Sequence, residues 1–231
     1  MWLMRTFVVM IALAGCNHHD AAVDAAVPRD AVPDAPPVAL DCPSYCAEMD
    51  AHCTGANAQY SDAAHCSSAC KSFTVGASQI TDRTGNTLGC RIYYAGVPSM
   101  TDPGTHCVHA GPGGDLFSAS PPAFCAGDDV CVSFCTLEIM ACGTEMDPLP
   151  GMPLDGNNNP LYQYQDMADC MFWCGKFDKT HVYSTTAVGD SLACRMLHAT
   201  EASIAVKPDG ATHCYETSPF SERVCSGTAM P

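Results

Sequence analysis

The cysteines constrain this chain more than any other feature of its sequence. Seventeen occur in 231 residues, and all except Cys16 lie between Cys42 and Cys225. These sixteen fall into two sets of eight with similar spacings, and an even number in each set suits disulfide pairing. The first set is Cys42, Cys46, Cys53, Cys66, Cys70, Cys90, Cys107 and Cys125. The second set is Cys131, Cys135, Cys142, Cys170, Cys174, Cys194, Cys214 and Cys225.

Other residues keep the same register in both segments. The sequence LGCR at 88–91 matches LACR at 192–195, and THC occurs both at 105–107 and at 212–214. Self-similarity of this kind indicates a repeated structural unit. We therefore predict that the body of the chain is one unit present twice.

The first residues have the layout of a secretory signal. Arg5 precedes an apolar run from Phe7 to Ala14, which is shorter than the about 20 residues that a membrane-spanning helix needs. The run ends in LAGC at residues 13–16. This ending resembles the lipobox of bacterial lipoproteins. The alternative is an ordinary short signal that a cysteine follows by chance.

The resemblance to the lipobox implies a lipoprotein. The signal peptide would be residues 1–15, and a lipid such as palmitate would be attached to the sulfur of Cys16. Two or three acyl chains hold a protein stably on a bilayer, whereas one does not. Asn17 follows the cysteine, and in the usual sorting rule this favours the outer membrane over the inner membrane. We expect a bacterial cell-envelope protein with the lipid bilayer as one partner.

A spacer rich in Ala, Asp, Pro and Val follows the signal. Together with the lipidated cysteine it covers residues 16–40. It contains four prolines, which interrupt helices, and no aromatic side chain that could build a core. We expect a disordered tether that carries the cysteine-rich body away from the membrane.

The cysteine spacing predicts helices in each unit. Cys42, Cys46 and Cys53 fall on one face of a helix, and Cys66 and Cys70 lie one turn apart on a second. A third helix is expected around the next cysteine of each set. The fold class is therefore predicted to be mainly α, as two tandem disulfide-stapled three-helix repeats with long irregular loops.

The repeat boundaries follow from the two cysteine sets. Repeat 1 is expected over residues 41–126 and repeat 2 over 127–231. The segments from 107 to 125 and from 214 to 225 are expected to be irregular. Ser61 is expected to cap the second helix of repeat 1, because a serine side chain can accept the free N–H groups of a first turn.

Disulfides are the expected state of these cysteines. An exported chain meets an oxidising envelope in which paired thiols persist. Two cysteines one turn apart on a helix cannot easily bond each other. When two such helices pack antiparallel, the outer cysteine of one helix can bond the outer cysteine of the other, and the inner cysteine can bond the inner one. This arrangement is similar to the twin C-x3-C hairpins of small intermembrane-space chaperones. This geometry predicts the bonds Cys42–Cys70, Cys46–Cys66, Cys131–Cys174 and Cys135–Cys170.

The sequence does not decide how the remaining cysteines pair, because eight cysteines in one unit allow about a hundred connectivities. They are Cys53, Cys90, Cys107, Cys125, Cys142, Cys194, Cys214 and Cys225.

A few residues are candidate metal ligands. His106 and His213 occupy equivalent places directly before a cysteine, and a hydrogen bond within each repeat is the alternative to a ligand role. Asp155, Asn157 and Asn159 are spaced as in a calcium loop, but a proline occupies the position of that loop's glycine, so a plain polar turn is the alternative. Methionines in repeat 2 leave copper as a further candidate. Apart from the lipid we expect no cofactor, with calcium and copper as the two ions to test.

Charge and motifs exclude several function classes. The chain has 10 Lys+Arg against 25 Asp+Glu and a net charge of −15, so it has no basic footprint for nucleic acid. It also contains no G-x-S-x-G, Walker A or H-E-x-x-H motif. We therefore expect that the chain is not an enzyme.

The function that these features favour is that of a membrane-anchored envelope lipoprotein. Its disulfide-rich ectodomain would be a non-catalytic binding or structural module with an envelope protein or a glycan as partner. The alternative is a metal- or cofactor-binding redox accessory protein of the cell envelope. Lipobox, spacer and cysteine-rich body together are similar to cysteine-rich lipoproteins of myxobacteria and related Deltaproteobacteria, and that resemblance implies no activity.

Overall fold

The computed structural model describes most of the cysteine-rich body. The described residues are 38–73, 78–114, 124–126, 130–145, 162–204, 209–221 and 224–226. The predicted signal peptide, the predicted lipidation site Cys16 and the predicted tether as far as residue 37 lie outside them. So do Asp155, Asn157 and Asn159 of the candidate calcium loop. A boundary between two units of the chain falls between Pro37 and Val38.

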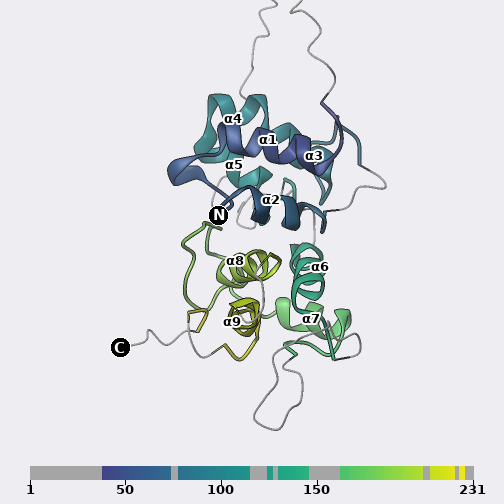
Figure 1. Cartoon of the computed structure of the whole chain (residues 1–231), viewed down its shortest axis with the longest axis vertical. Helices are drawn as coiled ribbons and strands as arrows, with labels where there is room; N and C mark the ends of the chain where they lie inside the picture. The colour runs from purple at the N-terminus through teal and green to yellow at the C-terminus, as the bar shows by residue number, and fades with distance from the viewer. Residues whose placement is uncertain are drawn as a thin grey trace, which may run out of the picture. The chain divides into compact units, whose positions relative to one another are not determined.

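The body is helical and has two halves, residues 38–126 and 130–226 (Figure 1). The first half contains α1 (Cys42–His52), the 3-10 turn η1 (Gly55–Asn57), α2 (Ala63–Cys70), α3 (Leu88–Ala95), α4 (Val97–Thr101) and α5 (Pro103–Ala110). The second half contains α6 (Val130–Cys142), α7 (Met167–Cys174), α8 (Leu192–Ala202) and α9 (Asp209–Thr217).

The mainly helical class predicted from the sequence is confirmed. The described residues form no β-strand, and their β-pairing is limited to an isolated bridge between Asp178 and Ser191. None of the described helices combines the length and the apolar character that crossing a bilayer requires.

The expectation of three helices in each half is wrong. Helix α5 carries Cys107 and α9 carries Cys214, in segments that were expected to be irregular. Helix α5 forms because Asp102 accepts a hydrogen bond from the backbone N–H of Thr105 (3.2 Å). Pro103 also starts its first turn, where the missing N–H has no helical partner to lose. The Asp-Pro pair was the sequence signal for this helix.

Side-chain caps fix the starts of the helices that carry the cysteines. Asp62, rather than the predicted Ser61, caps α2, and its carboxylate accepts hydrogen bonds from two backbone N–H groups of the first turn. Asp166 caps α7, and its carboxylate accepts a hydrogen bond from the backbone N–H of Asp169 (2.9 Å). Thr87 caps α3 and Ser191 caps α8, each by accepting a hydrogen bond from the N–H of the cysteine three residues later. Such caps satisfy donors that a helix start leaves free.

Eight disulfides cross-link the body, four in each half. The bonds in the first half are Cys42–Cys70, Cys46–Cys66, Cys53–Cys107 and Cys90–Cys125. The bonds in the second half are Cys131–Cys174, Cys135–Cys170, Cys142–Cys214 and Cys194–Cys225. In both halves the first cysteine bonds the fifth, the second the fourth, the third the seventh and the sixth the eighth. The structure contains the four pairs expected from antiparallel C-x3-C helices, and none of the eight bonds joins the two halves.

A buried arginine holds the last cysteine segment of each half in place. Arg91 is 0 % exposed, stacks over the ring of Phe73 (3.9 Å) and donates a hydrogen bond to the carbonyl oxygen of Cys125 (2.7 Å). Arg195 is 1 % exposed, stacks over Phe177 (4.1 Å) and donates to a carbonyl oxygen beyond α9. Burial lowers the pKa of Arg91. A guanidinium on an aromatic face is a favourable contact in a dry interior.

Each half has its own apolar core. The cluster in the first half includes Tyr45 and Leu88, and the cluster in the second half includes Phe134 and Leu192. Ala69 is an exception, because it lies on α2 of the first half but packs in the cluster of the second half. Helix α2 and the residues that lead into it, among them Tyr60, are therefore a part of the first half that contacts the second.

Candidate functional site

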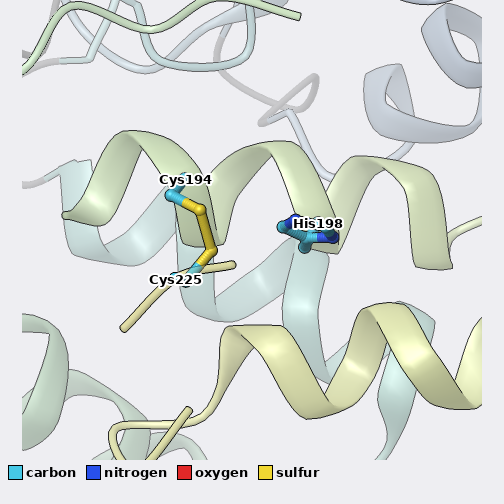
Figure 2. A group of neighbouring side chains, drawn as sticks. All are labelled: Cys194, His198 and Cys225. Carbon is cyan, nitrogen blue, oxygen red and sulfur yellow. A yellow bond between two sulfur atoms is a disulfide. The ribbon is translucent and has the colours of Figure 1, made fainter. Parts of the chain in front are cut away.

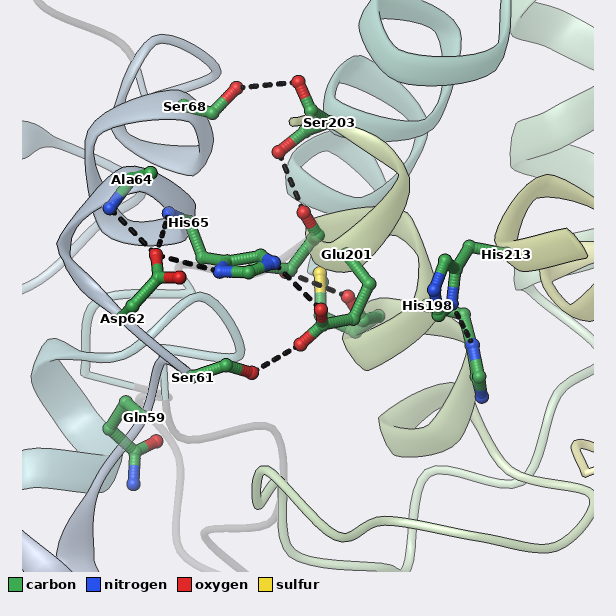
Figure 3. Close-up of polar contacts among 12 residues, drawn as sticks. Gln59, Ser61, Asp62, Ala64, His65, Ser68, His198, Glu201, Ser203 and His213 are labelled. Carbon is green, nitrogen blue, oxygen red and sulfur yellow. Dashed lines mark hydrogen bonds and ion pairs between the residues drawn. The ribbon is translucent and has the colours of Figure 1, made fainter. Parts of the chain in front are cut away.

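The contact between α2 and α8 is built on one histidine between two carboxylates (Figure 3). His65 Nε2 lies 2.7 Å from a carboxylate oxygen of Glu201 on α8. His65 Nδ1 lies 2.9 Å from the carboxylate of Asp62 in its own half. Ser61 donates a hydrogen bond to the other oxygen of Glu201. The histidine side chain is 10 % exposed and that of Glu201 is 20 % exposed, so these contacts are largely shielded from water.

Two more hydrogen bonds join the halves beside this cluster. The hydroxyl of Ser68 donates to the carbonyl oxygen of Ser203 (3.0 Å), and the phenol of Tyr183 donates to the carbonyl oxygen of Gln59 (3.1 Å). Tyr183 is buried, and desolvation raises its pKa, so it remains a neutral donor. The junction thus satisfies its polar groups across the interface, as buried polar groups require.

The order of side chains at the junction argues against a serine nucleophile. A nucleophilic serine needs a base that accepts its proton, and in the familiar triads that base is a histidine. Here Ser61 donates to Glu201, and His65 lies on the far side of that carboxylate. The pKa of Asp62 is lowered mainly because its carboxylate accepts a hydrogen bond from the backbone N–H of His65, and to a smaller extent because it also bonds to the imidazole of His65. Asp62 is therefore an ionised cap, and the cluster acts as a docking contact.

A small cleft lies beside the junction in the first half. Its volume is about 150 Å³, and α1 and the segment that leads into α2 line it, including Met49, Tyr60 and Asp62. Gln59 also lines it, but the carbonyl oxygen of the Gln59 side chain packs close to Gly111 rather than meeting a donor.

Both histidines proposed as ligands lie next to a second imidazole. The Nδ1 atoms of His106 and His109 are 3.4 Å apart on α5. The Nδ1 atoms of His198 on α8 and His213 on α9 are 2.9 Å apart. Desolvation, and then the neighbouring imidazole, lower the pKa values of His106 and His198. His109 was a candidate from the sequence together with His106, whose i, i+3 spacing is a usable signal, whereas His198 was missed as the partner of His213.

A group of three potential ligands in the second half is not a metal site as it stands. Ligand atoms of Cys194, His198 and Cys225 all lie within 4.8 Å of one another. Figure 2 shows the disulfide between the two cysteines. A disulfide sulfur is not the thiolate that metal ions select, so this group offers a single imidazole.

Two carboxyl groups are buried in the second half. Glu138 on α6 is 0 % exposed, accepts a hydrogen bond from the hydroxyl of Thr217 (2.8 Å) and leaves its other oxygen without a hydrogen-bond partner. Burial raises its pKa to about 8. Glu216 accepts hydrogen bonds from Ser221 and from the backbone N–H of Cys225. When Cys46 is aligned with Cys135, Glu138 falls at the position of Met49. Because the first half has an apolar residue there, the comparison of the two cysteine sets gave no sign of a buried acid.

A group of exposed aromatic side chains lies on the second half. Phe172 and Trp173 on α7 and Phe220 beyond α9 form a chain of ring contacts, with centroid distances of 5.4 and 5.2 Å. Phe172 is 59 % exposed and Phe220 is 69 % exposed. We call these three residues the aromatic surface.

A cleft of about 300 Å³ adjoins the aromatic surface. Its lining combines aromatic and charged side chains: Trp173, Lys176, Phe177, Asp178, Asp190 and Pro219. Large aromatic side chains on a surface are typical of binding sites rather than of a solvated face. Sequence reasoning did not single out the adjacent Phe172 and Trp173.

One comparison with known proteins gives a match. Residues 40–132 are similar to the BfoA family C-terminal domain, a bacterial family. The matched segment contains α1 to α5 and the first residues of α6. No curated protein and no solved structure matches the chain.

Glu138 gives the body a pH dependence that can be measured. Its pKa of about 8 in the folded state lies above its usual 4.5, so the folded state binds the proton more tightly and stability falls as pH rises through that window. At about 1.4 kcal/mol for each pKa unit, the fall is a few kcal/mol. We expect Glu138→Gln to remove most of this fall, measured by guanidinium denaturation between about pH 5 and pH 8.

The matched control is Glu145→Gln, because Glu145 is exposed. This variant should keep the pH dependence of the parent. An equal loss of stability toward pH 8 in Glu138→Gln and in the parent would show that Glu138 is not the group responsible.

Proposed function

We propose that this chain is a lipid-anchored protein of the bacterial cell envelope whose disulfide-rich body is a non-catalytic binding or structural module. The signal peptide would be residues 1–15, the lipidated residue Cys16 and the tether residues 16–40. The ending LAGC at residues 13–16 supports the anchor. The outer membrane is the proposed location because Asn17 follows the cysteine.

We further propose that the body is one helical unit present twice, as repeat 1 (41–126) and repeat 2 (127–231). The identical order of disulfides in the two halves supports this duplication. The equivalent buried arginines, Arg91 and Arg195, each stacked on a phenylalanine, support it independently. The repeated unit then has four longer helices rather than three, with the short α4 added in the first half.

The observation that carries the module proposal is the aromatic surface of the second half. Phe172 and Phe220 expose more than half of their area, and Trp173 joins them beside a cleft that contains both charges. Such a surface suits a glycan, whose sugar faces stack on aromatic rings, or an envelope protein that inserts an apolar side chain. The net charge of −15 disfavours nucleic acid as a partner.

The anchor has a direct test. We expect the N-terminal peptide of the membrane-extracted protein to begin at Cys16 and to carry acyl chains, as measured by mass spectrometry. Cys16→Ser should remove the lipid and release the protein from the membrane fraction, because the tether has no other apolar anchor. A mature N-terminus elsewhere, or an unmodified Cys16, would contradict the proposal.

Trp173 offers a built-in reporter for binding. The chain has two tryptophans, Trp2 in the predicted signal peptide and Trp173 in the aromatic surface. Titration of the mature chain with envelope glycans or envelope proteins should therefore shift its tryptophan emission when a partner covers the surface. We expect Trp173→Ala to weaken binding, measured by surface plasmon resonance, at least about tenfold because a stacked aromatic contact is lost.

The matched control is Val182→Ala, which shortens an exposed apolar side chain (58 % exposed) outside the aromatic surface. Its affinity should equal that of the parent. Tight binding that neither changes the emission nor responds to Trp173→Ala would move the binding site away from the aromatic surface.

A metal-binding accessory role is the second candidate, and the histidine pairs favour it. Two imidazole nitrogens that bind one ion at about 2.0–2.1 Å lie roughly 3 Å apart, and the pairs have separations of 2.9 and 3.4 Å. The lowered pKa values of His106 and His198 keep these rings in the neutral form that binds metals. Calcium is not favoured by these pairs, because it prefers oxygen ligands.

Calorimetric titration of the oxidised chain with Zn²⁺ and Cu²⁺ tests this candidate. We expect binding near neutral pH that weakens in acid, and His213→Ala should reduce the number of bound ions by one. His52→Ala is the control, because His52 bonds to Ala95 and Glu48 instead of a second imidazole. An absence of binding heat, or an unchanged stoichiometry in His213→Ala, would eliminate this role.

A further inference from the structure

The junction between the halves joins two different faces of the repeated unit. The first half contributes α2 and the second half contributes α8. This inference rests on the duplication proposed above, in which α2 corresponds to α7, and α8 corresponds to α3 with α4. Each chain then has two copies of each face. One copy of each face forms the α2–α8 junction within the chain, and the other copy of each face is unused.

The two unused faces lie on different halves. The counterpart of α2 is α7 in the second half, and the counterpart of the end of α8 is α4 in the first half. Figure 1 shows α4 and α7 on opposite sides of the α2–α8 contact. The internal junction therefore blocks neither face within the described part of the chain.

Two positions of the unused faces, one on each face, have changed from polar to apolar. Cys66 aligns with Cys170 and Cys90 with Cys194, and this register places Phe172 at the position of Ser68 and Val97 at the position of Glu201. Ser68 and Glu201 are polar residues of the junction. Phe172 is 59 % exposed and Val97 is 72 % exposed.

More apolar surface surrounds both positions. Met100 on α4 is 64 % exposed, and Trp173 on α7 takes the position of Ala69, which packs in the second-half core at the junction. A single exposed apolar side chain is ordinary on a protein surface. An exchange from polar to apolar on both members of a pair of faces suits a contact that burial of apolar surface stabilises.

We propose that copies of this chain dock head to tail, with α7 of one copy on α4 and the adjoining end of α3 of the next. The contact repeats the α2–α8 junction with Val97 in place of Glu201 and Phe172 in place of Ser68, whereas carboxylates, Asp169 and Asp166, stand in place of His65 and Asp62. Because its two faces differ, the interface is heterologous, and it produces open chains or rings rather than a closed dimer. The partner of the aromatic surface is then a second copy of this protein.

The charge of the chain sets the salt dependence of this assembly. Each copy carries a net charge of −15, so copies repel one another at low ionic strength. Salt screens this repulsion and does not weaken an apolar contact. Assembly therefore increases with salt, whereas a contact held by ion pairs would decrease.

Sedimentation velocity of the full chain tests the proposal, with Cys16→Ser in every variant so that lipid does not cause association. The otherwise unaltered chain forms species larger than a dimer as its concentration rises. Phe172→Lys and Val97→Asp each weaken association at least tenfold. An equimolar mixture of these two variants associates again, because the unaltered α7 face of the Val97→Asp copy meets the unaltered α4 face of the Phe172→Lys copy. Val182→Asp, outside both faces, assembles like the parent.

Three results would overturn the proposal. The first is a chain that stays monomeric at every concentration and salt. The second is an association that Phe172→Lys weakens and Val97→Asp leaves unchanged, which would indicate a symmetric contact between two α7 faces. The third is a mixture that stays monomeric although circular dichroism and a thiol count show that both variants are folded and oxidised. A monomeric chain that still binds a glycan or another protein through Trp173 would leave the module proposal standing and exclude self-docking.

Discussion

The cross-links between short helices are the constraint on which the rest of this structure depends. Helices α2 and α7 have eight residues each, and α6, the longest described helix, has 13. Isolated helices of this length are marginal in water. Each disulfide restricts the unfolded chain and typically contributes about 2–4 kcal/mol, although increments from neighbouring bonds do not simply add. The first two bonds of each half set a helix hairpin, and the other two attach its later segments.

With the chain confined in this way, polar side chains hold the parts together. Arg91 and Arg195 fix the last cysteine segment of each half, and His65 fixes one half to the other through Glu201. These contacts are directional, so they define a particular arrangement where apolar clusters alone would allow sliding. Glu138 is the exception, because its buried oxygen without a partner costs stability when the group ionises.

The sequence predicted the part of the fold that local spacing encodes. Two cysteines one turn apart define a helix face, and antiparallel packing of two such helices leaves few ways to pair them. The bonds of Cys53 and Cys194 span 54 and 31 residues, and nothing in local spacing chooses such partners. Helix α5 was missed because its signal is one capping aspartate followed by proline rather than a periodic pattern. The junction was also out of reach, because Ser61 and Glu201 are 140 residues apart in sequence.

The same connectivity in both halves underlies the duplication, the equivalence of the faces and the head-to-tail contact derived from it. Proteolysis of the mature chain in acid without reductant, followed by mass spectrometry of the linked peptides, measures it directly. The account predicts four bonds among cysteines 42–125 and four among cysteines 131–225. In each set they join the first to the fifth, the second to the fourth, the third to the seventh and the sixth to the eighth. A bond between the two sets, or a different order in one of them, would contradict it.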